Sequence, residues 1–278
     1  MGHHIRSSVA TPSHPGRRRF VTSLPLGGLV GAVLPGAAFV RVQPPAATVG
    51  EWFPRQDPAL AQEVVGASHS DIKRVRELVE RQPALARAAI DWGFGDWESA
   101  LGAASHTGRR EIAEFLLANG ARPTLFSAAM LGQLAVVRAF VESSPGIQGT
   151  PGPHGIPLLN HARAGGPGAT AVVTYLESVG GADVRPPSAP LAPSDRDAVV
   201  GRYVYGPSDR ERFDVDVRSD QLGLVHPAAS RRMLIHTGGL VFFPSGVPTV
   251  RIAFERAGGA VTGLTVADPD RILTARRN

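Results

Sequence analysis

Two adjacent stretches of the chain repeat one pattern of apolar residues, and this repetition limits the possible folds more than any other feature. In residues 99–123 and 124–146, an alanine-rich segment ends at a glycine, Gly108 or Gly132. Apolar residues stand four, five, eight and nine positions after each glycine: Ile112, Ala113, Leu116 and Leu117, then Val136, Val137, Phe140 and Val141. This spacing lies on one helical face, so each stretch predicts a helical hairpin that buries one stripe.

Two further stretches follow the pattern less regularly. Residues 57–85 have Ser70 at the turn position, and residues 156–183 keep Gly165 but insert three residues before the second apolar stripe. Glycine suits such turns because it adopts left-handed backbone angles without steric cost. Four helical hairpins in succession predict an α-solenoid with one continuous core.

This region resembles ankyrin repeats, and the resemblance covers about residues 57–183. The matching segments are Pro157-Leu158, Gly120-Ala121 and Gly181-Ala182-Asp183. In the unit that begins at residue 99, Ser99 and Gly102 stand where ankyrin repeats carry threonine and histidine. The resemblance implies a bacterial ankyrin-repeat protein that binds a protein partner and is not an enzyme. A helical-hairpin array of another repeat class is the alternative.

The C-terminal part has the alternating pattern of strands. Beyond a proline-rich linker at residues 186–195, Phe213, Val215 and Val217 alternate with charged residues, which is the period of a half-buried strand. Residues 196–278 therefore predict a small antiparallel β-meander or barrel-like domain. Three segments of it are similar to a small β-domain appended to β-lactamase-related secreted hydrolases: 201–203, 213–225 and 250–266. The expected fold class is α+β multidomain, with an ankyrin-like α-solenoid in residues 57–185 followed by this domain.

The N-terminal residues have the pattern of an export signal. Residues 17–21, Arg-Arg-Arg-Phe-Val, precede an uncharged apolar run at 24–40, and this arrangement resembles a bacterial twin-arginine signal. We expect a signal peptide in residues 1–38, a tether in 39–56 and a periplasmic or extracellular protein. Stable membrane insertion after cleavage is not expected, because two prolines interrupt the apolar run.

Charge and cysteine content exclude several classes of protein. Of the net charge of +5, residues 1–38 contribute +4, so the remaining chain is almost neutral and does not predict nucleic-acid binding. The chain has no cysteine, which excludes disulfides, thiolate nucleophiles and thiolate-bound zinc.

Several histidines raise the question of catalysis or metal binding. The tripeptide Ala-Ser-His occurs at residues 67–69 and 104–106, and we interpret it as a mark of equivalent helix ends rather than as two catalytic pairs. His154 and His161 are seven residues apart with no acidic residue at ligand spacing. The sequence therefore predicts no catalytic residue, no cofactor and no metal site.

The tryptophan-rich segment at residues 91–98 is the best candidate for a partner surface, because aromatic residues on loops are frequent interface anchors. The expected contact residues are Asp91, Trp92, Phe94, Asp96, Trp97, Glu98, His106, Arg109, Arg110 and Met130. The alternative is that both tryptophans fold back to cover neighbouring helices. A second functional hypothesis is a secreted enzyme or small-ligand carrier with a pocket in the β-domain, lined by Tyr203, Tyr205, His226 and His236.

Overall fold

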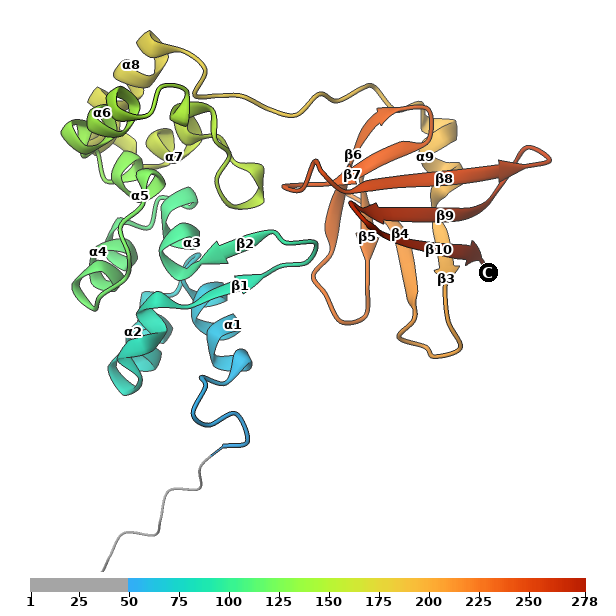
Figure 1. The fold of residues 1–278 in the computed structure, drawn as a ribbon, viewed down its shortest axis with the longest axis horizontal. Helices are drawn as coiled ribbons and strands as arrows, with labels where there is room; N and C mark the ends of the chain where they lie inside the picture. Colours follow the sequence, from blue (N-terminus) through green and yellow to red (C-terminus); the bar gives the residue numbers. More distant parts are fainter. Residues whose placement is uncertain (1–49) are drawn as a thin grey trace, which may run out of the picture. The chain divides into compact units, whose positions relative to one another are not determined.

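The computed structural model describes residues 50–278 (Figure 1). The expected signal peptide and most of the expected tether lie outside these residues. In the described range the chain first forms short helices with one small hairpin and then a β-barrel. No helix of residues 50–278 combines the length and the apolar character needed to cross a bilayer.

Eight of the nine α-helices in residues 50–278 form the helical part, and consecutive helices contact each other in pairs (Figure 1). Short 3₁₀ turns and a two-stranded hairpin separate some of them. The helices are α1 (Pro58–Ala67), α2 (Ile72–Arg81), α3 (Ala100–His106), α4 (Arg110–Ala118), α5 (Leu125–Met130), α6 (Leu134–Ser143), α7 (Leu158–Ala164) and α8 (Thr170–Val179). The hairpin strands are β1 (Ala89–Asp91) and β2 (Trp97–Ser99), and the 3₁₀ turns are η1 (Pro83–Arg87), η2 (Ile147–Gly149), η3 (Pro153–Gly155) and η4 (Gly166–Ala169).

Local sequence signals explain where these helices begin and turn. The side chain of Ser99 caps α3 by accepting a hydrogen bond from the Gly102 backbone N–H, and Thr124 with Ser127 forms a capping box at α5. Gly108 and Gly132 adopt the left-handed angles expected of them, with φ of +69° and +75°. A Cβ at either position would also collide with a backbone carbonyl oxygen, so both turns require glycine.

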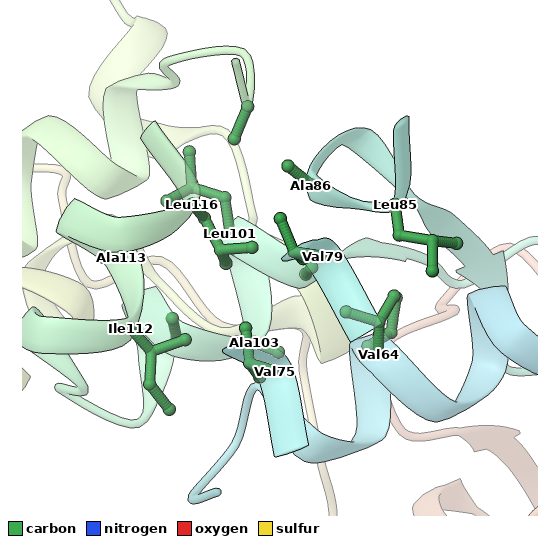
Figure 2. Close-up of a cluster of buried hydrophobic side chains, with 14 of the residues drawn as sticks. Val64, Val75, Val79, Leu85, Ala86, Leu101, Ala103, Ile112, Ala113 and Leu116 are labelled. Atoms are coloured by element: carbon green, nitrogen blue, oxygen red, sulfur yellow. The ribbon is translucent and has the colours of Figure 1, made fainter. Parts of the chain in front are cut away.

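A buried cluster of aliphatic side chains holds α1 to α4 together (Figure 2). Val75 and Val79 of α2 pack with Leu101 of α3 and with Ile112 and Leu116 of α4. These side chains are almost completely removed from solvent, so the 3.6-residue spacing in the sequence identified this part of the core.

The predicted α-solenoid is wrong. Residues 50–278 contain nine α-helices of six to ten residues that do not form a repeating unit. The segments inserted between the helix pairs differ from one another. The β1–β2 hairpin lies between α2 and α3, and a loop with two 3₁₀ turns lies between α6 and α7. The buried side chains consequently form two clusters, one spanning residues 64–130 and one spanning 125–182, rather than one continuous core.

The apolar stripe of α6 also departs from the expectation. Val137 and Val141 are buried, but Val136 and Phe140 are each 42% exposed. The fixed offsets from Gly132 therefore identified a helix but not its buried face, because neighbouring helices cover only one side of α6.

The C-terminal strands close into an eight-stranded antiparallel barrel (Figure 1). Helix α9 (Pro193–Val199) lies within and just after the expected linker. The strands are β3 (Gly201–Val204), β4 (Arg212–Arg218), β5 (Gln221–Val225), β6 (Arg232–Gly238), β7 (Val241–Pro244), β8 (Arg251–Ala257), β9 (Ala260–Asp268) and β10 (Arg271–Arg277). Pairing of β10 with β3 completes the ring, so no strand of the barrel is left as an unpaired edge.

Side chains fill the barrel. Tyr203, Phe242, Ile252 and Leu264 are buried and belong to one apolar cluster. The Tyr203 hydroxyl donates a hydrogen bond to the Val199 carbonyl at 2.7 Å, which satisfies its polar atom. The barrel therefore has a packed interior.

Candidate metal centre

Three histidines and one glutamate from separate elements meet in the helical part of the chain. Glu98 lies on β2, His106 ends α3, His69 follows α1, and His154 lies in η3. One ligand atom from each lies within 4.8 Å of the others. These residue types are the nitrogen and oxygen ligands that zinc and similar metal ions use.

The three imidazoles surround the Glu98 carboxylate through the same ring atom. His106 Nε2 lies 2.9 Å from Glu98 Oε1, whereas the Nε2 atoms of His154 and His69 lie 3.3 and 3.4 Å from Oε2. Two ligand atoms of a tetrahedral ion with bonds of ~2.0–2.1 Å are separated by roughly 3.3 Å. Each observed nitrogen–oxygen separation is close to that value; His106 faces one carboxylate oxygen, and His69 and His154 face the other.

Outer contacts orient two of the imidazoles. The Nδ1 atom of His69 lies 3.1 Å from the backbone oxygens of Val65 and Gly66, which can only accept hydrogen bonds. The Nδ1 atom of His154 lies 2.7 Å from Asp96 Oδ2. In the neutral ring this leaves Nε2 without a proton, which is the tautomer that binds a metal through Nε2.

Asp96 is itself held by two parts of the chain. Its Oδ1 accepts a hydrogen bond from the His154 backbone N–H at 2.9 Å, and its Oδ2 pairs with Arg232 Nη2 of β6 at 2.6 Å. Burial would raise the pKa of the Asp96 carboxyl, but the His154 hydrogen bonds and the Arg232 charge outweigh burial and lower it. Asp96 therefore remains a carboxylate that positions His154.

Trp92 forms one wall of the centre. Its indole Nε1–H donates to Glu98 Oε2 at 2.8 Å, and its ring lies edge-on to His69 with 6.2 Å between centroids. This hydrogen bond uses one lone pair of Oε2 and fixes the orientation of the carboxylate, whose Oε1 faces His106.

Two atoms at the centre lack hydrogen-bond partners. Glu98 Oε1 and His106 Nε2 are both buried and lie 2.9 Å apart, and neither has another hydrogen-bond partner. Buried polar atoms of this kind are costly unless something satisfies them. A metal ion bound to both would do so, and the donor set of the centre fits such an ion.

Neighbouring groups shift the pKa values of Glu98 and His154. Burial would raise the pKa of the Glu98 carboxyl, but the neighbouring His106 and His154 imidazoles lower it to about 2. Burial would lower the pKa of His154, but Asp96 and Glu98 raise it to about 9. Without a metal, the cluster is an ion pair network of two carboxylates with His154 and Arg232; a metal would have to displace the His154 proton.

His161 lies beside the centre and is not one of its four residues. Its side chain is fully buried between Phe126 and His106, with ring centroids 4.8 and 6.2 Å away, and neither ring nitrogen has a hydrogen-bond partner. Burial, with a smaller effect of His106, lowers the pKa of His161 to about 3. The ring is therefore neutral at neutral pH.

The structure divides the ten expected contact residues into three groups. Asp91, Trp97 and Arg109 are exposed; Trp92, Phe94, His106 and Arg110 are half-buried; Asp96, Glu98 and Met130 are buried. It brings Trp92, Asp96, Glu98 and His106 together at the centre. Met130 lies in the apolar core, and Phe94 packs against the barrel cluster.

Two of the four residues of the centre carried a signal in the sequence. His69 and His106 end the two Ala-Ser-His tripeptides, and equivalent helix ends in neighbouring hairpins lie side by side. No sequence pattern relates His69 and His106 to His154. The loop after α6 places His154 next to Asp96.

The four residues of the hypothetical β-domain pocket do not meet at one place. Tyr205 Oη and His226 Nε2 lie 2.8 Å apart, Tyr203 is buried in the barrel, and both ring nitrogens of His236 contact backbone oxygens, of Ala189 and Gly239. The hypothesis of a functional pocket in the β-domain remains a prediction.

Comparisons with known proteins found no match: no family model, no curated protein and no solved structure is similar to this chain at a significant level. The centre is therefore interpreted from its own geometry.

Proposed function

We propose that this protein binds one divalent transition-metal ion, of the zinc class, through His69, Glu98, His106 and His154. The observation that carries the proposal is the convergence of three Nε2 atoms on one buried carboxylate. Imidazole and carboxylate ligands suit Zn²⁺, Co²⁺, Ni²⁺ and Fe²⁺, and the outer contacts of His69 and His154 are those of metal-binding histidines.

The test is a Zn²⁺ titration of chelator-treated protein by isothermal calorimetry. Wild-type protein should bind one ion per chain, and His106→Gln and Glu98→Gln should each lose affinity by more than about 100-fold, since each removes a direct ligand. His226→Gln is the matched control, because it removes a barrel histidine that lies outside the centre. Equal affinity of wild type and Glu98→Gln would contradict the proposal.

A second proposal concerns an exported interaction protein. The Trp97 side chain on β2 is 65% exposed, and an exposed indole on a hairpin is a favourable anchor for a protein partner. A pull-down from bacterial culture extract with wild type and Trp97→Ala tests this proposal. The same partner list with both proteins would remove Trp97 as a contact. Export itself remains a prediction from residues 1–38.

A further inference from the structure

Solvent reaches the candidate metal centre mainly at His69 and His154. The side chains of His69 and His154 are 28% and 24% exposed, whereas those of His106 and Glu98 are 12% and 0% exposed. A ligand from solvent would therefore reach a bound ion past His69 and His154.

A hollow of about 290 Å³ lies beside His69 and His154. It is lined by His69, Trp92, His154, Ser230, Arg231, Arg232, Met233 and Ser245. The hollow has room for a small molecule but is smaller than the pockets that hold drug-sized ligands. Its lining is polar and cationic next to the histidines.

Arg232 in this lining has an unsatisfied donor. Its side chain is 9% exposed, and its Nη2 is used by Asp96 Oδ2 and by the Ser245 carbonyl. Its Nε–H is buried and has no hydrogen-bond partner. The Nε–H has no contact with solvent, but Arg232 as a residue lines the hollow, and oxyanions are the acceptors that guanidinium groups bind best.

We propose that the hollow binds a small oxyanion, a carboxylate or phosphate group, between the Arg232 guanidinium and the metal ion; this inference rests on the proposed metal centre. A metal ion and a guanidinium both attract negative charge, and two of the four metal-binding residues, His69 and His154, line the same hollow as Arg232. Because the protein supplies four ligands, the oxyanion would be the fifth, and zinc sites can reach a coordination number of five. Because Asp96 already pairs with Arg232, the metal ion supplies most of the charge that attracts the oxyanion, and the Arg232 guanidinium lies beside it.

Arg231 is held by the barrel. Its Nε donates to Asp216 at 2.7 Å and its Nη2 donates to the Gln221 carbonyl at 2.7 Å, so two of its three nitrogens have partners within the barrel. Arg232 is the arginine of this lining that also pairs with Asp96 at the candidate metal centre.

The experiment uses the full chain loaded with Co²⁺, whose visible absorption reports its coordination number. Formate and inorganic phosphate are titrated separately, so that the two arms distinguish a carboxylate from a phosphate. We expect a saturable change of the absorption bands with at least one of them. Arg232→Gln should raise the dissociation constant of that anion by about tenfold or more, because a charged hydrogen bond is lost.

Three controls make the result decisive. Ser230→Trp places an indole at the hollow while keeping Arg232 and Asp96, and should also weaken anion binding. Arg202→Gln, which removes a barrel arginine paired with Asp214, should leave it unchanged. Equilibrium dialysis of Co²⁺ with each variant shows separately whether the metal still binds.

The outcomes separate the two proposals. Stoichiometric Co²⁺ binding with no spectral change in either anion titration would overturn the oxyanion site and leave the metal centre standing. Anion binding of equal affinity in wild type and in both Arg232→Gln and Ser230→Trp would also overturn it. Failure of wild-type protein to bind Co²⁺ would overturn the metal centre and the oxyanion site together.

Discussion

Asp96 and His154 are 58 residues apart in sequence and are joined by two hydrogen bonds. The Asp96 carboxylate accepts one from the His154 backbone N–H at 2.9 Å and lies 2.7 Å from His154 Nδ1. The pair fixes both the loop that carries His154 and the orientation of its ring. As a result, His154 Nε2 faces Glu98.

Loss of this carboxylate should weaken metal binding although Asp96 is not a ligand. We expect Asp96→Asn to reduce Zn²⁺ affinity by about 10–100-fold, because the amide holds His154 less strongly and no longer pairs with Arg232. Calorimetric titration measures the effect. Asp214→Asn, an aspartate on the barrel surface, is the control, and an equal effect of both substitutions would contradict the assigned role of Asp96.

Trp92 should report the metal ion by fluorescence. Its indole bonds to Glu98, so a paramagnetic ion such as Cu²⁺ or Co²⁺ at the centre should quench its emission. Quenching should be largely lost in Trp92→Phe and retained in Trp97→Phe, in which the exposed tryptophan of the same hairpin is removed. Quenching of the same size in both variants would place the ion elsewhere.

His161 should make the metal-free protein less stable in acid. Its pKa is about 3 in the folded chain, against about 6.5 for an ordinary exposed histidine, so below pH 6.5 the unfolded chain binds a proton that the folded chain does not. The contribution that neutral, buried His161 makes to the free energy of unfolding is present above pH 6.5 and is lost as the pH falls toward 3. Between pH 7.5 and 5 this lowers the free energy of unfolding by about 2 kcal/mol.

Urea unfolding of wild type and His161→Leu at the two pH values measures this contribution. The variant should lose less stability than wild type on acidification by about that amount. His226→Leu serves as the control, since His226 lies in the barrel. An identical pH dependence of wild type and His161→Leu would contradict the prediction.

The turn at Gly108 should tolerate substitution less well than the turn at Gly120. Both glycines have left-handed angles, with φ of +69° and +91°, so alanine costs about 1–2 kcal/mol of backbone strain at each. At Gly108 the new Cβ would also collide with the Ala164 carbonyl, whereas nothing lies within 4 Å of a Cβ at Gly120. The midpoint temperature of thermal unfolding should therefore be clearly lower for Gly108→Ala than for Gly120→Ala.

Local periodicity located much of the secondary structure in the sequence. The offsets from Gly108 identified the buried side chains of α4, and the alternation around Phe213 and Val215 identified β4. Both patterns reflect the repeat of the backbone itself, which is 3.6 residues in a helix and two in a strand. The inference from these elements to a solenoid failed, because periodicity does not say how much chain is inserted between helix pairs.

Glu98 shows the limit of sequence reasoning most clearly. In the sequence it is one acid in a tryptophan-rich segment and suggests a surface contact. In the structure it is buried at the meeting point of three histidines.

The sequence alone determined the short helices, their glycine turns and the strands, because these depend on residues that are neighbours in the chain. Tertiary structure alone decided that the strands close into a barrel and that His69, Glu98, His106 and His154 meet. Those relationships depend on contacts between distant segments, whose geometry is set by packing and by the buried ion pairs of Asp96.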